Sequence, residues 1–539
     1  MATRDEGGAA AAAPAHRIGA YAWYALGVLV LVYIINFIDR QILSILVTDI
    51  KADLKVTDAQ IGFLYGTAFA VFYALFGIPL GRLADSWYRG RLMAMGLALW
   101  SSMTVLSGFA NSFGMLAAAR IGVGIGEASA SPAAYSMISD SFPKERRATA
   151  LSIYSSGLYI GGALSLPIGG LVVSRWNTAY PDPAAAPFGL AGWQAAFLAV
   201  GLPGLFLAIW VLTLREPQRG ASDGLPQPVV RPNAWRDFGR ELVAILPPLT
   251  LLSVSRIPGA LRTNLVVLVG VALAGYGLYR LTGDWPQWLA YGIGAYAIFS
   301  WVQSLKHRDL PAYRLIWGSP VVVLLAIAFG SISFVTYATS FWIPPYVEAY
   351  FYAGGTAPAR YLEGLSAKSE VGVIIGWSAA VSAAAGVILG GYLSDVWRER
   401  DPRGRIFVNM LSAVLPIPLI AFMLTTESLT AFYLVNPVAH LCASAWVGAA
   451  VATLQDLVLP RMRATAGATY ILGTTMVGLA LGPYYAGKMS VVMQSLPAGI
   501  AMLYLMPPLT LIGLWIGSRH IAALEATKVE RARAAGEPI

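Results

Sequence analysis

The chain has 539 residues, of which 57% are hydrophobic and only 12% are charged. Soluble domains carry about 25% charged residues, so this composition excludes disordered proteins, disulfide scaffolds and almost all ordinary soluble enzymes. The net charge of +9 would suggest a nucleic-acid partner in a soluble protein, but here its meaning depends on where the basic residues lie relative to the apolar runs. One cysteine and four histidines give little basis for a metal site, and we expect no cofactor.

Apolar runs long enough to cross a bilayer, which takes about 20 residues, recur along the chain. Six lie in an N-terminal half, at 21–47, 59–83, 92–110, 114–140, 148–174 and 194–214. Six more lie in a C-terminal half, at 315–347, 371–394, 406–426, 429–455, 464–487 and 495–518. The sequence therefore predicts an all-α membrane protein with six-helix bundles over 21–214 and 314–518, flanked by cytoplasmic tails at 1–20 and 519–539.

The segment 215–313 between the halves is unusually long and mixed in character. It begins with a polar linker, and the run 241–255 that follows is too short to cross, so we expect an interfacial helix there. Two longer runs, 263–281 and 286–305, predict an extra transmembrane hairpin. That interpretation gives 14 spans; the other leaves 12 spans joined by a hydrophobic linker.

Basic residues are concentrated in alternate loops. They follow the second, fourth, eighth and tenth spans, whereas the loop at 111–113 and the loop around Glu427 contain none. Because basic loops stay on the cytoplasmic side, this pattern predicts both termini in the cytoplasm and explains most of the net charge without nucleic acid. The first apolar run is a full span, which we expect to be retained rather than cleaved as a signal.

The two halves repeat the same short motifs. Gly81-Arg82-Leu83-Ala84-Asp85 ends the second span and Gly391-Tyr392-Leu393-Ser394-Asp395 ends the eighth. Arg-Ala-Thr-Ala opens the fifth span at Arg147 and the eleventh at Arg463, and a proline lies 20 residues after each arginine. Related halves of this kind are typical of transporters with a binding site at the midplane between them.

These motifs resemble the signature of the major facilitator superfamily. The resemblance covers the twelve core spans, although the loop after Asp85 is two residues longer than the family pattern. The N-terminal half further resembles the Spinster family of lysolipid and sphingolipid transporters, through Asn36-Phe37-Ile38-Asp39-Arg40, the Gly81–Asp85 motif and the run from Arg120 to Ala128. The C-terminal half matches only the superfamily, and the 263–305 hairpin lies outside the Spinster pattern.

Three ionisable residues stand out inside predicted spans: Asp39, Arg120 and Glu127. Such residues are costly in a membrane and indicate function. Asp39 and Arg120 lie at similar depth, so we expect them to pair, with Arg40 as a competing partner of Asp39. Our hypothesis is that Asp39 and Glu127 couple transport to protons. Arg120, with Asn36 and Arg40, then either competes with the proton for these carboxylates or binds an anionic substrate head. A purely structural Asp39–Arg120 salt bridge is the alternative.

The family resemblance implies a second set of charges that closes the cytoplasmic side when the outer side is open. Its members are the two motif aspartates and nearby arginines: Asp85, Asp395, Arg89, Arg91, Arg147, Arg398 and Arg463. The alternative is that the arginines only set topology. Aromatic residues and one histidine are candidates for an amphipathic cavity: Tyr65, Tyr154, Tyr337, Trp342, Trp377, His440 and Trp446.

The sequence contains no Walker, zinc-protease or serine-hydrolase motif. The Gly122-x-Gly124-x-Gly126 run resembles a loose nucleotide-binding pattern, but we reject it because it lies inside an apolar span without a preceding strand. We therefore expect a proton-coupled, alternating-access transporter in the cell membrane, monomeric and not an enzyme. The resemblance favours a lysolipid or sphingoid-type amphiphile as substrate. A small organic anion such as a sugar acid or aromatic acid, held by Arg120, and a passive lipid scramblase are the alternatives.

Overall fold

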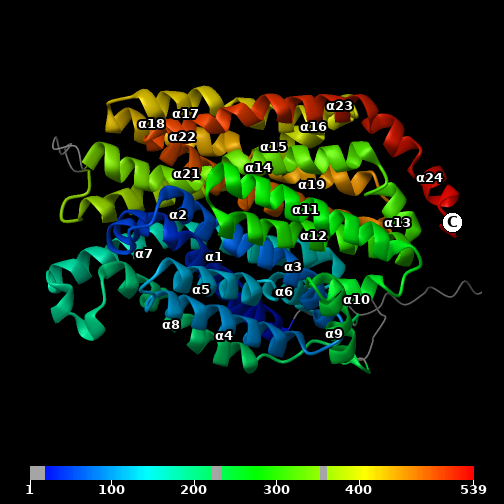
Figure 1. Cartoon of the computed structure of the whole chain (residues 1–539), viewed down its shortest axis with the longest axis horizontal. Helices are drawn as coiled ribbons and strands as arrows, with labels where there is room; N and C mark the ends of the chain where they lie inside the picture. Colours follow the sequence, from blue (N-terminus) through cyan, green and yellow to red (C-terminus); the bar gives the residue numbers. More distant parts are fainter. Residues whose placement is uncertain (1–18, 221–229, 231, 353–360, 539) are drawn as a thin grey trace, which may run out of the picture.

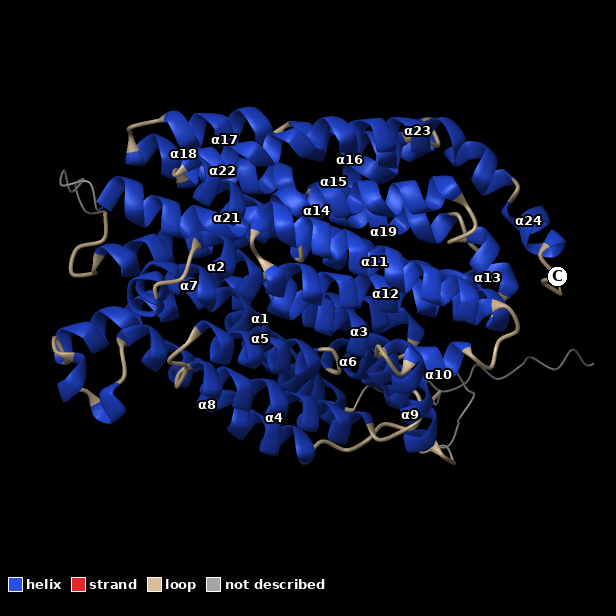
Figure 2. Cartoon of the chain, in the orientation of Figure 1, coloured by secondary structure: helices blue, strands red, loops and turns tan. Residues whose placement is uncertain are grey.

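A computed structural model describes residues 19–220, 230, 232–352 and 361–538. Every regular element in these ranges is helical (Figure 2). The helices form two bundles that lie side by side along the long axis of the molecule (Figure 1). The N-terminal bundle, blue to cyan, occupies the lower half of that view, and the C-terminal bundle, green to red, occupies the upper half.

The N-terminal bundle contains the six predicted spans, two of which are broken into consecutive helices. Its helices are α1 (Ala20–Leu54), α2 (Asp58–Tyr65) with α3 (Thr67–Ala84), α4 (Arg89–Ser107), α5 (Phe113–Glu127) with α6 (Ala130–Ser141), α7 (Lys144–Ala179) and α8 (Gly192–Leu212). The α2–α3 break lies at Gly66, whose backbone leaves the helical region at φ −88° and ψ −90°. Without a side chain, Gly66 lets the main chain of the opposite bundle approach closely, since a Cβ there would lie 2.6 Å from the carbonyl oxygen of Leu479.

The connecting segment is helical over most of its described length. It contains α9 (Ala234–Ile245), α10 (Thr250–Val254), α11 (Ala260–Thr282), α12 (Trp285–Arg308) and α13 (Leu310–Leu315). The predicted interfacial run at 241–255 thus becomes the end of α9 followed by the short α10. The helices α11 and α12 form the expected antiparallel hairpin and turn at Gly283, where φ is +80°.

The hairpin lies along the boundary between the two bundles (Figure 1). Its second helix, α12, buries Ala297 in a cluster with Val71 and Leu75 of α3 and with Leu472 and Met476 of the C-terminal bundle. The first helix, α11, has most of its residues exposed and buries only Ala260 and Asn264. In a membrane protein such an apolar exposed face is suited to contact with lipid.

The C-terminal bundle also contains six spans, most of them in more than one piece. These are α14 (Pro320–Val347), α15 (Ala367–Arg400), α16 (Gly404–Val414) with α17 (Pro416–Thr425), α18 (Leu429–Ser444) with α19 (Trp446–Asp456), α20 (Arg463–Leu472) with the π-helix η6 (Gly473–Leu479) and α21 (Gly482–Met493), and α22 (Leu496–Ala501) with α23 (Met506–Ala526). A final helix, α24 (Lys528–Ala534), lies within the predicted tail.

Eleven helical stretches of the described chain are long and apolar enough to cross a membrane. They include α11 but not α4, α5–α6 or α12. The helix α4 begins with Arg89 and Arg91, α5 carries Arg120 and Glu127, and α12 contains polar residues, which lowers their mean hydropathy. The all-α fold with two bundles and an inserted hairpin is confirmed, whereas the number of spans remains a prediction.

Candidate functional site

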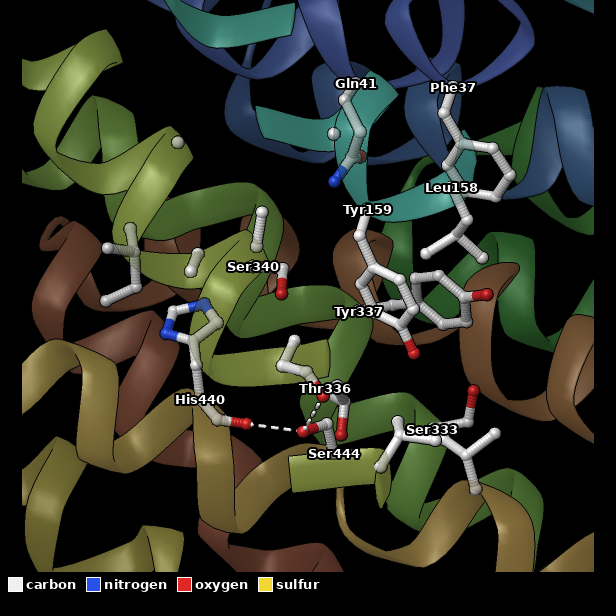
Figure 3. A pocket seen from close by; sticks show the side chains of 18 of the residues that line it. Phe37, Gln41, Leu158, Tyr159, Ser333, Thr336, Tyr337, Ser340, His440 and Ser444 are labelled. Carbon is white, nitrogen blue, oxygen red and sulfur yellow. Dashed lines mark hydrogen bonds between the residues drawn. The ribbon is translucent and has the colours of Figure 1, made fainter. Parts of the chain in front are cut away.

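A cavity of about 350 Å³ lies between the two bundles (Figure 3). Helices α1 and α7 form its N-terminal wall, and α14, α15, α18, α19, α20 and η6 form its C-terminal wall. The described residues that line it include no Asp, Glu, Lys or Arg. The α15 side is apolar and built from small residues at helical spacing, namely Gly376, Ala379, Ala380 and Ala383.

Three of the seven predicted cavity residues line this space: Tyr337, His440 and Trp446. Three others are packing residues outside it. The ring of Tyr65 stacks 4.1 Å from Phe341, Tyr154 stacks 4.5 Å from Tyr33, and the indole nitrogen of Trp342 donates to the carbonyl of Pro483 at 2.9 Å.

Trp377 lies outside the cavity, contrary to the prediction, and 46% of its surface is exposed. Its neighbours Gly376 and Ala380 line the cavity. Because consecutive residues point about 100° apart on a helix, Trp377 is directed to the outer surface of α15. The sequence alone does not reveal which face of an all-apolar helix is turned inward.

Most polar residues of the cavity were missed by the sequence interpretation. They are Gln41, Ser44, Tyr159, Ser333, Thr336, Ser340, Ser444, Tyr470 and Thr474. One signal was present: Ser333, Thr336, Tyr337 and Ser340 follow the i, i+3, i+4, i+7 pattern along an otherwise apolar span. Such a polar stripe marks one face of a helix, and α14 turns this face toward the cavity (Figure 3).

A buried charged cluster lies inside the N-terminal bundle. Arg40 donates to a carboxylate oxygen of Glu127 at 2.7 Å, and both side chains are almost completely buried. The guanidinium of Arg40 also lies over the rings of Phe69 (4.3 Å) and Phe37 (4.9 Å), which favours a cation. The predicted competition of Arg40 for Asp39 is therefore wrong in this conformation, because adjacent residues on α1 point in different directions.

Asp39 is fully buried and forms no ion pair in the described structure. Its Oδ2 accepts from the hydroxyl of Thr104 at 3.3 Å, whereas its Oδ1 has no hydrogen-bond partner among the described residues. Arg120 donates to the main-chain carbonyl of Asp39 at 3.2 Å. The expected pairing of Asp39 with Arg120 is thus a contact through the backbone rather than a salt bridge.

The charged cluster and the cavity lie on two faces of the same helix. Phe37, Gln41 and Ser44 of α1 line the cavity, whereas Asp39 and Arg40 are buried toward the other helices of the N-terminal bundle. Asn36 is also buried, one turn before Arg40. Asp39 therefore lies on the far side of α1 from the cavity, whereas the guanidinium of Arg40 reaches the ring of Phe37, which lines the cavity.

The bundles are joined at the end of the molecule that carries Lys368, which we call the Lys368 end. The amine of Lys368 at the start of α15 forms ion pairs with Asp49 of α1 and, at 3.1 Å, with Glu348. The hydroxyl of Thr48 donates to Glu348 at 3.1 Å, and Ser490 donates to Asp58 at 2.6 Å. Charge and hydrogen bonds thus connect both bundles at this end.

Main-chain contacts add to the closure at the Lys368 end. A Cβ on Gly372 of α15 would lie 2.6 Å from the carbonyl oxygen of Leu166 on α7, and one on Gly376 would lie 2.8 Å from that of Ala163. Only glycine allows helices to approach so closely.

The opposite end, which we call the basic end, carries the predicted gate residues. Arg89 is buried and pairs with Glu216 at 2.6 Å and with Asp140. Arg398 pairs with Glu525 at 2.5 Å. These pairs each join parts of one half of the chain.

The remaining gate candidates lie at the same end. Asp395 accepts from Arg405 at 3.2 Å within the C-terminal bundle. Asp85 follows the last turn of α3, Arg147 lies in the first turn of α7, and Arg463 begins α20. The guanidinium of Arg91 stacks 4.5 Å from the ring of Tyr88.

The model of the Major Facilitator Superfamily matches residues 29–483 of the chain. The protein belongs to this superfamily. It is 27% identical over 510 residues to an MFS-type efflux pump of Mycolicibacterium smegmatis, and the match covers 92% of each chain. It is 26% identical over 473 residues to protein spinster homolog 1 of Mus musculus, covering 86% of this chain and 72% of that protein.

A solved structure of a bacterial homolog of the human lysosomal transporter Spinster, in an inward-facing and unoccupied conformation, has the same fold. The TM-score is 0.66 at 24% identity, and the match covers 95% of this chain and 98% of that one. The predicted resemblance to the Spinster family is confirmed. Shorter matches include probable sugar-acid transporters of Escherichia coli, over about a third of this chain.

Proposed function

We propose that this protein is a proton-coupled secondary transporter that moves a lysolipid or sphingoid-type amphiphile by alternating access. The observation that carries the proposal is the uncharged cavity between the bundles, separated by one helix from the buried carboxyl of Asp39. We place both termini in the cytoplasm of a cell membrane, so that the basic end faces inward.

The cavity favours an amphiphile because its lining combines apolar and polar helix faces. The face of α15 offers Gly376, Ala380 and Ala383 to an apolar chain, while His440 and Ser444 of the neighbouring helix α18 offer polar atoms. Sites that are mostly apolar with a few placed polar groups are typical of small-molecule binding. The relative named as an efflux pump supports export as the direction.

The small-organic-anion alternative receives less support. It needs Arg120 as the anchor, but Arg120 is fully buried in the N-terminal bundle and is not among the residues that line the cavity. An anion in the cavity would lose its hydration without meeting a cation from the described lining, which is unfavourable.

The two candidate proton carriers differ in their surroundings. Glu127 is held by Arg40 at 2.7 Å, so its ionised form has a partner. Asp39 has no such partner, and an unpaired carboxylate is expensive to bury. A protonated Asp39 therefore fits this conformation. We assign proton coupling first to Asp39, and Glu127, in its ion pair with Arg40, is the second candidate.

The test is uptake of a fluorescent lysolipid into proteoliposomes with an imposed pH gradient. The wild-type protein should accumulate the lysolipid beyond equilibrium, and Asp39→Asn should bind it but only equilibrate it. Thr104→Val is the matched control, because it removes the hydroxyl bound to Asp39 and leaves the carboxyl in place. Accumulation by Asp39→Asn would contradict the coupling role, and equilibration alone by the wild type would identify a scramblase.

A further inference from the structure

A second apolar cavity, of about 390 Å³, lies between α11 and α12, the two helices of the inserted hairpin (Figure 1). Its described lining contains no charged residue. It is open along one side, since Tyr276 and Leu289, which both line it, each expose 57% of their surface. We call it the hairpin groove, and its lining residues include Leu268, Gly275 and Tyr276 of α11 and Trp288, Gly292 and Tyr296 of α12.

The groove occupies the part of the hairpin next to the turn. On α11 its lining extends from Leu268 to Tyr279, a rise of about 17 Å along the helix. Its other end is at Tyr296, which is buried and donates to Oδ1 of Asn264 at 2.6 Å. One leaflet of the hydrocarbon core is about 15 Å thick. The length of the groove therefore fits an alkyl chain that enters near the turn and ends near the bilayer centre.

Aromatic residues are concentrated at the turn end of the groove. Those that line it there are Tyr276, Tyr279, Trp285 and Trp288. Tyrosine and tryptophan favour the level of the lipid head groups, so this end of the groove fits the membrane surface. A molecule in the groove would then have its apolar part inside the hydrocarbon core and its polar part beside the turn.

A cation lies at the same end. Arg280, in the last turn of α11, donates to the hydroxyl of Tyr276 at 3.1 Å, so its guanidinium lies beside the lining of the groove. Among the described residues Arg280 forms no ion pair. The nearby Asp284 is paired with Lys488 of α21 at 2.9 Å and accepts from Tyr484 at 2.9 Å. The charge of Arg280 is therefore available to an anion at the depth of the head groups.

We propose that the hairpin groove binds one acyl chain of a membrane phospholipid and that Arg280 pairs with the phosphate of the same molecule. Lipid tails are as apolar as the groove, so the chain gains mainly by packing against a preformed surface. The phosphate adds a charged interaction that a neutral lipid lacks. The groove shares no lining residue with the cavity between the bundles, so this phospholipid site stands apart from the transported substrate.

The test uses the full-length protein in nanodiscs that contain a small fraction of phosphatidylglycerol with a photoactivatable diazirine in one acyl chain. Peptide mass spectrometry then locates the cross-links. In the wild type, labelling should concentrate in the hairpin between Leu268 and Tyr296. A diacylglycerol probe with the same chains and no phosphate should label this region about fivefold less, which is the effect of one basic residue on binding of an anionic lipid.

The variant Gly275→Leu should fill the groove with its own side chain and lower labelling by the phosphatidylglycerol probe about tenfold. Gly277→Leu is the matched control on the same helix. A Cβ on Gly277 meets no atom within 4 Å, and Gly277 is not among the described residues that line the groove. Gly277→Leu should therefore be labelled like the wild type.

The variant Arg280→Gln changes an exposed side chain and provides a second test if Gly275→Leu folds poorly. It should lower labelling by the phosphatidylglycerol probe about fivefold and leave labelling by the diacylglycerol probe unchanged, so that the two probes become equal. Arg262→Gln, which changes an exposed arginine in the first turn of α11, should keep the ratio of the two probes found in the wild type.

Wild-type labelling that is spread evenly over the lipid-facing helices would overturn the inference, because it would identify ordinary surrounding lipid. Equal labelling of the wild type by the two probes would also overturn it, as would undiminished labelling of a folded Gly275→Leu variant. Equal losses in Arg280→Gln and Arg262→Gln would contradict the phosphate contact, because they would show a general attraction of the protein for anionic lipid.

Discussion

The two ends of the molecule hold their charges in different ways. At the Lys368 end, Lys368 of the C-terminal bundle pairs with Asp49 of the N-terminal bundle. At the basic end, Arg89 pairs with Glu216, and Arg398 with Glu525, each within one half of the chain. The conformation is therefore one in which charge closes the Lys368 end between bundles, while the named pairs of the basic end stabilise each bundle separately.

This difference fits a rocking motion of rigid bundles. Alternating access requires the contacts at the Lys368 end to separate and the arginines of the basic end to find partners across the bundles. We propose that the glycine contacts between α7 and α15 hold the first state, and that Asp85 and Asp395 of the repeated motifs supply charges for the second. Variants at the two ends should therefore have different consequences.

The largest effect is expected from Gly372→Leu. Its side chain would collide with the main chain at Leu166, 2.6 Å from the position of the Cβ, and overpacking of this kind costs about 1–3 kcal/mol or more. The closed Lys368 end should open. Spin labels at Ala52 and Gln494, in a Cys442→Ser background, should lie farther apart than in the wild type, as measured by double electron–electron resonance.

A matched control lies on the same helix. A Cβ on Gly391 meets no atom within 4 Å, so Gly391→Leu should leave the distance between the labels unchanged. An equal shift in both variants would mean that leucine disturbs α15 generally, and the role given to the Gly372 contact would be wrong.

A smaller effect is expected from Lys368→Met. The substitution leaves Asp49 and Glu348 without their shared cation, and because both carboxylates are partly exposed the cost is below the roughly 3–5 kcal/mol of breaking a fully buried pair. The same label pair should show a partial shift toward the open end. Adding Asp49→Asn and Glu348→Gln should reverse most of it, because the uncompensated charges are then removed. Lys55→Gln, an exposed lysine at the same end, should have no effect.

Asp456→Asn should affect stability without changing the distance between the bundles. Asp456 accepts from both Arg398 and Arg405 inside the C-terminal bundle. Losing a charged hydrogen bond costs about 1.5–3 kcal/mol, less where the groups are partly exposed. Thermal unfolding should therefore occur at lower temperature. A changed distance at the Lys368 end would show that the two ends are coupled more tightly than proposed.

The smallest effect is expected from pH at the Arg461–Asp309 pair, whose atoms lie 2.8 Å apart. Hydrogen bonds from Arg461 lower the pKa of Asp309 below its ordinary value. The pair therefore contributes its full stabilisation of the folded protein above a pH of about 4, and this stabilisation is lost as the pH falls through the lowered pKa of Asp309.

The contribution is about 1 kcal/mol or less, because the pair is half exposed. Between pH 7 and pH 3, the wild type should lose slightly more thermal stability than Arg461→Gln does. Arg519→Gln serves as the control, since Arg519 stacks 4.0 Å from the ring of Trp515, which does not titrate between pH 7 and pH 3. An unchanged pH dependence in Arg461→Gln would contradict the role of the pair.

The sequence predicted much of the architecture. Hydropathy placed α11 and α12 within a few residues of their observed bounds, and the rarity of charge inside apolar runs singled out Asp39, Arg120 and Glu127, all of them buried. It did not predict that Glu127 pairs with Arg40. One carboxylate and one arginine on each of the two helices α1 and α5 allow several pairings, and the pairing that forms depends on how each helix is rotated.

Composition and spacing by themselves determined the solvent of this protein, its two related halves and the few charges kept inside the bilayer, because burying charge and leaving backbone groups unpaired in lipid are costly along any chain. Only the tertiary structure decided which face each helix turns inward. Trp377 therefore faces outward although its neighbours line the cavity, and the polar stripe of α14 faces the cavity. Helix rotation and tilt follow from packing against other helices, which local sequence does not specify.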